Sequence, residues 1–105
     1  MPGAVLSAGL VGSAAVLTVG LLSVAAGAVF GQRLAGTADA AALAAADTAS
    51  GAVIGVPCVR AEEVAASGGA AIESCDVEGL IATVTVSARF GALPAAASAR
   101  AGPPP

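Results

Sequence analysis

The sequence predicts an α+β chain in which one long N-terminal transmembrane helix continues into an alanine-rich extension, followed by a short helix packed on a two-stranded antiparallel hairpin. Three observations carry this prediction. An uncharged apolar run extends from Ala4 to Gly31, alanine dominates from Arg33 to Asp47, and apolar and polar side chains alternate from Leu80 to Phe90. The alanine-rich pattern favours helix, and the alternation is typical of a half-buried strand.

The composition excludes most enzyme chemistry. The chain of 105 residues has no His, Lys, Trp or Tyr, so it cannot build a His-based proton relay, a Lys Schiff base or a His-containing zinc site. Its two cysteines cannot fill a four-ligand metal site, and its net charge of −3, with no basic cluster, argues against nucleic acid. We therefore expect no enzyme activity, cofactor, metal or small-molecule substrate, and we interpret Glu62-Glu63 and Asp76/Glu78 as surface charges.

The run from Ala4 to Gly31 has three interpretations. As a helix it would be about 42 Å long, and a bilayer core requires only about 20 such residues. A cleaved signal peptide is one alternative, because Ala26-Gly27-Ala28 resembles a small-x-small cleavage site, although the run is longer than usual. A buried helix of a soluble protein is another, but the polar remainder is too short to cover it. We favour a single membrane span.

The helix is expected to continue beyond the membrane. Residues up to Asp47 are mostly alanine and leucine, the strongest helix formers, and Ser50-Gly51 provides a stop with Gly51 as the C′ residue. This gives a first unit of residues 1–50. Within the span, small residues recur every four positions at Ser23, Gly27, Gly31 and Ala35. Such a stripe allows close helix packing in lipid, but it can also arise by chance in a chain this rich in Gly and Ala.

Residues 51–90 are expected to form a small second unit. Pro57 suits the first turn of a helix that runs to Ser67, and two strands follow with a turn at Glu78-Gly79. Cys58 begins the helix and Cys75 lies on the first strand, so a disulfide would join them. The alternative is two unpaired cysteines that act as small apolar residues. Pairing places the unit outside the cytoplasm. Residues 91–105 are interpreted as a flexible Ala/Gly/Pro tail.

The run R-L-A-G-T-A-D-A-A-A-L-A-A-A, from Arg33 to Ala46, resembles the hallmark of TadE/TadG-like proteins of the tight-adherence (Flp) pilus assembly system. The positions that carry this family motif are Arg33, Leu34, Ala38, Asp39 and Leu43. The order of parts, with a Gly- and Ala-rich first helix, two cysteines and a Val-rich strand, also resembles small TadE-like proteins. No catalytic or ligand-binding residue is implied.

The resemblance implies a pilin-like or accessory component of a pilus or secretion apparatus. Such a protein would sit in the cytoplasmic membrane of a bacterium as a single-pass protein, with its N-terminus inside and its C-terminal unit outside. Its partners would be the lipid bilayer, related pilin-like or Tad-type membrane subunits and, through self-association, other copies of the chain. The competing hypothesis is a small exported binding module released by cleavage near Ala28.

Overall fold

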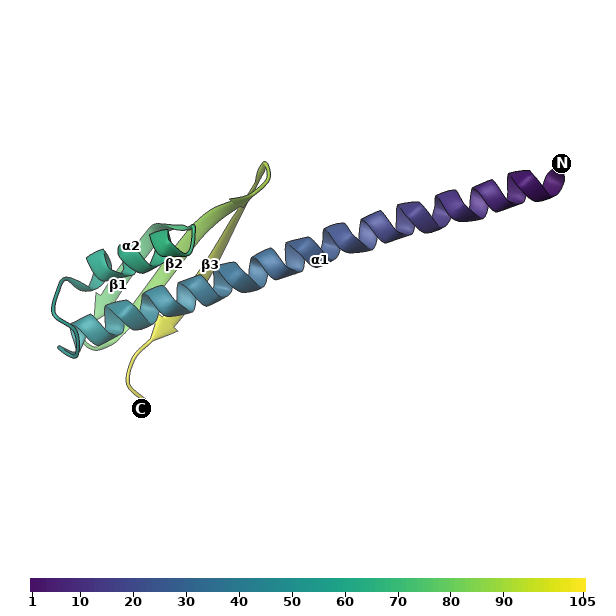
Figure 1. Cartoon of the computed structure of the whole chain (residues 1–105). Coiled ribbons are helices and arrows are strands. Elements are labelled where there is room, and N and C mark those ends of the chain that lie inside the picture. Colours follow the sequence, from purple (N-terminus) through teal and green to yellow (C-terminus); the bar gives the residue numbers. More distant parts are fainter.

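A computed structural model describes residues 1–105 and confirms the α+β class (Figure 1). The elements are two helices, α1 (Pro2–Ala49) and α2 (Pro57–Ser67), and three strands, β1 (Ala71–Glu78), β2 (Ile81–Phe90) and β3 (Leu93–Ala101). The molecule measures 76 × 28 × 16 Å because α1 extends far beyond the other elements. We call the free part of α1, residues 2–33, the stem, and the packed remainder, residues 34–101, the head.

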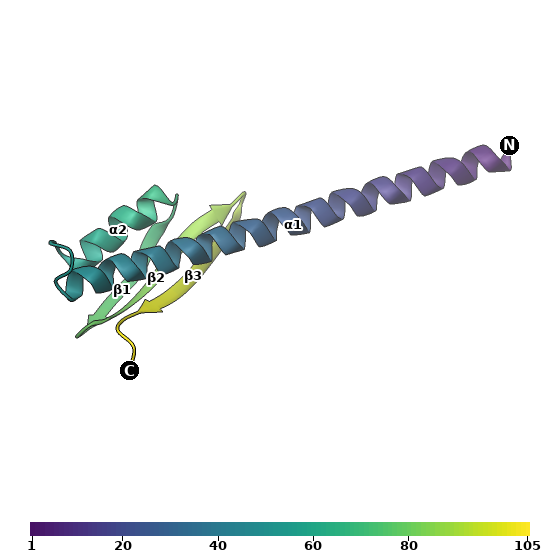
Figure 2. The ribbon, with the colours of Figure 1, turned by 60° about the horizontal axis from the view of Figure 1, so that its bottom comes forward.

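Helix α1 runs without a break from stem to head. Pro2 stands in its first turn, where a missing N–H costs nothing, and Ser50 is its C-cap. Gly51 follows with φ +84°, a conformation that glycine adopts without strain, so the predicted helix stop is confirmed. In both views α1 lies beside α2 and across the sheet over its last turns only (Figures 1 and 2). The first turns of the helix have no neighbour.

The sheet is antiparallel with the strand order β1-β2-β3. The central strand pairs on both sides, with Val84 opposite Cys75 on β1 and opposite Ala99 on β3. Each connection is a two-residue turn that begins with a glycine of positive φ, namely Gly79 at +62° and Gly91 at +63°. A glycine at the first central position is the requirement of a type II′ hairpin turn.

The prediction of a two-stranded hairpin followed by a flexible tail at residues 91–105 was wrong, because Leu93–Ala101 form the third strand. Alanine has low strand propensity, which disguised the strand in the sequence. Its alternation is nevertheless regular. The partly buried side chains are those of Ala95, Ala97, Ala99 and Ala101, and each lies against the core. After β3, only residues 102–105 remain outside any element.

Alanine dominates the core of the head. Eleven buried apolar residues form one cluster, and eight of them are alanines; the others are Leu34, Val84 and Val86. On α1 the buried positions include Ala38, Ala41 and Ala45, which repeat at helical spacing. These small side chains meet the alanines of β3, so the helix and the sheet can approach closely. The alanine bias of the sequence therefore has a structural cause in the head.

Candidate membrane anchor and helix-packing surface

The stem is apolar on every side, and the rest of the chain covers it only around Gly27 and Phe30, which are half-buried. Apart from Phe30, its large apolar side chains are at least half exposed: Val5, Leu6, Leu10, Val11, Val16, Leu17, Val19, Leu21, Leu22, Val24 and Val29. At 100° per residue these positions surround the whole helix axis, so the stem has no polar face. The helix is long and apolar enough to cross a membrane, and its most apolar window has no buried residue. The stem is therefore not a covered core segment of this chain.

Two of the four hydroxyl groups of the stem, those of Thr18 and Ser23, donate to carbonyls of the helix itself. Thr18 donates its hydroxyl hydrogen to the carbonyl of Ala14 at 2.8 Å, and Ser23 donates to the carbonyl of Val19 at 2.9 Å. In hydrocarbon an unsatisfied polar group costs several kcal/mol, so these local hydrogen bonds make the side chains compatible with lipid. The hydroxyl of Ser23 consequently points at its own backbone.

The predicted small-residue stripe is divided in the structure. Ser23, Gly31 and Ala35 are exposed, and a Cβ at Gly31 would meet no atom within 4 Å. Gly27 is half-buried, because the ring of Phe90 would lie 3.9 Å from a Cβ at that position. Three positions are therefore free for a partner helix, and the fourth lies against the chain's own hairpin.

The five positions of the family motif also divide into two groups. Leu34 is 5% exposed and Ala38 is fully buried, and both belong to the core of the head. Arg33, Asp39 and Leu43 are exposed, and 55% of Leu43 is accessible. The first group therefore packs α1 onto the head, whereas the second group faces outward along α1.

A disulfide joins Cys58 to Cys75, so the predicted pairing is confirmed. It connects the first turn of α2 to the middle of β1, and the two Cα atoms lie 5.9 Å apart. Only Ala61 and Ala65 of α2 are fully buried, and alanine buries little apolar area. The covalent bond is therefore a principal constraint that holds α2 on the head.

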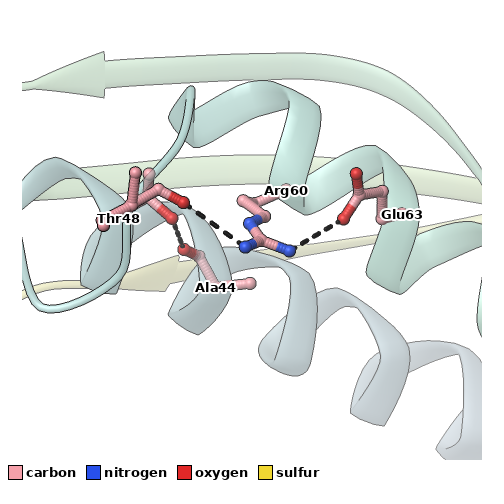
Figure 3. A network of polar contacts seen from close by, with 5 residues as sticks. Ala44, Thr48, Arg60 and Glu63 are labelled. Carbon is pink, nitrogen blue, oxygen red and sulfur yellow. Dashed lines mark hydrogen bonds and ion pairs between the residues drawn. The ribbon is translucent and has the colours of Figure 1, made fainter.

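The polar contacts near α2 are local, and those of Arg60 are exposed (Figure 3). The guanidinium of Arg60 lies 3.1 Å from the carboxylate of Glu63, and it also donates to the carbonyl of Ile54 at 3.3 Å. Nearby, the hydroxyl of Thr48 donates to the carbonyl of Ala44 at 2.7 Å. An exposed ion pair is worth about 0–1 kcal/mol. The bond from Arg60 to Ile54 connects α2 to the loop that precedes it. Together these contacts do not form a reactive cluster.

The surface hollows of the head contain few groups that could perform chemistry. The largest, about 690 Å³, is open to solvent at the end of the sheet, and its charged lining residues are Glu73 and Arg89. No group of three or more His, Cys, Asp or Glu side chains comes together in a way that could hold a metal ion. Glu62 and Glu63 are exposed on α2, as are Asp76 and Glu78 on β1.

The sequence did not indicate that the turn between β2 and β3 returns to the stem. Phe30 of α1 and Phe90 at the end of β2 are the only aromatic residues, and their ring centroids lie 5.1 Å apart. The rarity of aromatic residues was the available signal, since two isolated rings often pair. Comparisons with protein-family models, curated proteins and solved structures find no match to this chain.

Proposed function

We propose that this protein is a membrane-anchored, pilin-like accessory component of a pilus assembly or secretion apparatus, as the TadE/TadG-like resemblance implies. It acts structurally, through association of its helix, and not through a pocket. Its partners are the bilayer, related pilin-like or Tad-type membrane subunits and other copies of the chain. The observation that supports this proposal most is the uncovered stem, which is apolar on every side.

The continuity of α1 explains how such a component would work. Stem and head share one helix, and the head is packed onto its last turns through residues such as Leu34 and Ala45. When stems pack side by side in a membrane, the heads are therefore held at a defined spacing and orientation. A flexible linker between stem and head would lose this coupling.

The disulfide supports the orientation that we propose. Structural disulfides persist in exported compartments and are rare in the cytosol. With Cys58 joined to Cys75, the head belongs on the outer side of the cytoplasmic membrane, and the N-terminus belongs inside. Arg33 then lies at the outer end of the span, where its cation can reach the phosphate layer.

The test uses the protein isolated from its native host. Alkaline carbonate washing should leave it in the membrane fraction, and intact mass should show that the stem is retained. Mild detergent extracts should contain it together with membrane subunits of a pilus or secretion apparatus. A soluble chain that begins near Ala28 would contradict the proposal and support the exported binding module.

A matched pair of variants separates membrane insertion from general folding defects. Val16 lies near the middle of the stem and is 72% exposed, so neither variant disturbs the head. Val16→Arg should lower membrane insertion by about 2.5–3.5 kcal/mol on the translocon scale, whereas Val16→Leu should insert normally. Equal membrane retention of the two variants would exclude the span.

A further inference from the structure

The tip of the β2–β3 hairpin approaches the stem at a defined height. The tip consists of Phe90, the turn Gly91-Ala92, and Leu93, and in both ribbon views it ends level with the middle of α1, although its turn stands clear of the helix ribbon in Figure 1. Its contacts on α1 are Phe30, through the paired rings, and Gly27. Both α1 residues belong to the uncharged run, so the tip reaches the level of the proposed span.

The length of the uncharged run gives the depth of this contact. The 31 residues from Pro2 to Gln32 carry no charged side chain and span about 46 Å as a helix. A bilayer with its headgroup layers is about 40–45 Å thick. The run is therefore long enough to cross the bilayer, with Arg33 at the outer surface. Phe30 lies about 4.5 Å from Arg33 toward the membrane centre, which is interfacial depth.

The chemistry of the tip suits that depth. Leu93 is 67% exposed and Phe90 is 39% exposed, which is unusual for large apolar side chains on a small folded unit. Two exposed cations, Arg33 and Arg89, lie next to the tip, and Glu73 of β1 shares a surface hollow with Arg89. The tip residues themselves, from Phe90 to Leu93, carry no acidic side chain that would repel lipid phosphate.

A hollow between the tip and the stem provides a second, independent observation. Its volume is about 450 Å³, and its lining is apolar from Leu22 to Phe30 on α1 and at Phe90 on β2. Arg33 is the one charged residue of the lining. An apolar hollow with a single cation matches a phospholipid, whose acyl chain is apolar and whose headgroup carries a phosphate anion.

We propose that the β2–β3 tip is a second membrane contact, in which Phe90 and Leu93 enter the outer interfacial layer and a bilayer phospholipid occupies the hollow beneath them. Aromatic and apolar side chains at this depth hold membrane proteins at the interface. The contact fixes the tilt and rotation of the head relative to the membrane. It rests on the proposed span of α1, so its test measures the span separately.

The absence of Trp and Tyr makes the test direct, because one introduced Trp is the only strong fluorophore. Three single variants are reconstituted as full chains into vesicles whose phospholipids carry bromine either near the headgroup or near the chain end. Leu93→Trp reports the tip and Val16→Trp reports the span. Leu80→Trp is the matched control, because Leu80 is 47% exposed on the other turn, beside Asp47 and Ser50. Its height is about 25 Å beyond Phe30.

We expect Leu93→Trp to be quenched about twofold or more relative to Leu80→Trp, and more strongly by shallow than by deep bromine. Val16→Trp should show the reverse depth preference. Quenching of Val16→Trp without quenching of Leu93→Trp would overturn the tip contact and leave the span intact. Blue-shifted but unquenched Leu93→Trp would also overturn it, because a protein would then cover the tip. An unquenched Val16→Trp would overturn the span and the contact together.

Discussion

Phe30 and Phe90 pack against each other with their ring centroids 5.1 Å apart and their planes inclined by 35°. They are sixty positions apart in the sequence, and they join the stem to the far end of the sheet. Elsewhere the core between α1 and the sheet consists mainly of alanine, so this pair is the one aromatic contact between the two. An aromatic pair contributes about 0.5–1.5 kcal/mol beyond the area that it buries.

Replacing Phe90 with Ala should therefore release the hairpin tip from the stem. We expect a loss of about 1–2 kcal/mol in local stability, since Phe90 is partly exposed and its ring contact disappears. Exchange of the backbone amide hydrogens of residues 89–93, measured in detergent micelles, should accelerate. The control is Leu93→Ala, a neighbouring change at a side chain that is 67% exposed. Equal exchange in the two variants would show that the ring pair does not hold the tip.

Loss of the disulfide should destabilise the head. In the chain-entropy description a bond that closes a separation of 17 residues contributes about 3 kcal/mol. Cys75→Ala should lower the thermal midpoint and make α2 sensitive to protease. Reductant should also lower the thermal midpoint of the unmodified chain. The double variant Cys58→Ala/Cys75→Ala should lose no more stability than either single variant. Additive losses would mean that the cysteines contribute separately and not through one bond.

Close contact between Gly68 and Thr37 gives a third prediction. A Cβ at Gly68 would lie 2.6 Å from the hydroxyl oxygen of Thr37, and the φ of −90° at Gly68 is acceptable for any residue. Gly68→Ala should therefore destabilise the packing of α2 on α1 by about 1–3 kcal/mol through overlap alone. Thr37→Ala should restore much of this loss in the double variant, which a double-mutant cycle measures.

A separate glycine is the control for that experiment. Gly36 lies inside α1, and a Cβ there would meet no atom within 4 Å. Gly36→Ala should consequently stabilise the helix by about 0.5–1 kcal/mol. If Gly68→Ala also stabilised the chain, the close approach of α2 to α1 would be incorrect.

The sequence was sufficient for the elements whose signals are local. The stop of α1 at Gly51 and the start of α2 at Pro57 depend on backbone preferences that single residues express. The alternation of apolar and polar residues in β2 also predicted which side chains face the core. Val84 and Val86, on the apolar side of that pattern, are the largest fully buried side chains.

Two features could not be predicted because they depend on distant contacts. Ala95 and Ala99 have no intrinsic preference for a strand, and β3 forms because α1 and β2 provide a surface on which only small side chains fit. The contact of Phe90 with Gly27 required the position of the hairpin relative to the stem. A small residue at position 27 is compatible both with a helix from another chain and with Phe90 of the same chain, so the sequence pattern does not distinguish the two.

That ambiguity affects the final prediction, which concerns helix association. Leu at position 27 would disturb Phe90 as well as any partner helix, so loss of association by Gly27→Leu has two explanations. Gly31 is exposed and has open space around it, and it therefore provides the clean test of the stripe formed by Ser23, Gly31 and Ala35. Small residues at such positions let two helix backbones approach closely in lipid.

Gly31→Leu should weaken self-association, or co-purification with a related membrane subunit, because the larger side chain separates the two backbones. The measurement is a reporter of transmembrane association with the full chain. Val29→Leu is the control: Val29 is 51% exposed and lies about 160° around the helix from Gly31, so its change should have little effect. Equal signals from both variants and the unmodified chain would mean that the stripe follows from composition. The stem would then act only as a membrane anchor, and the disulfide-linked head would be the better candidate for contact with a partner protein.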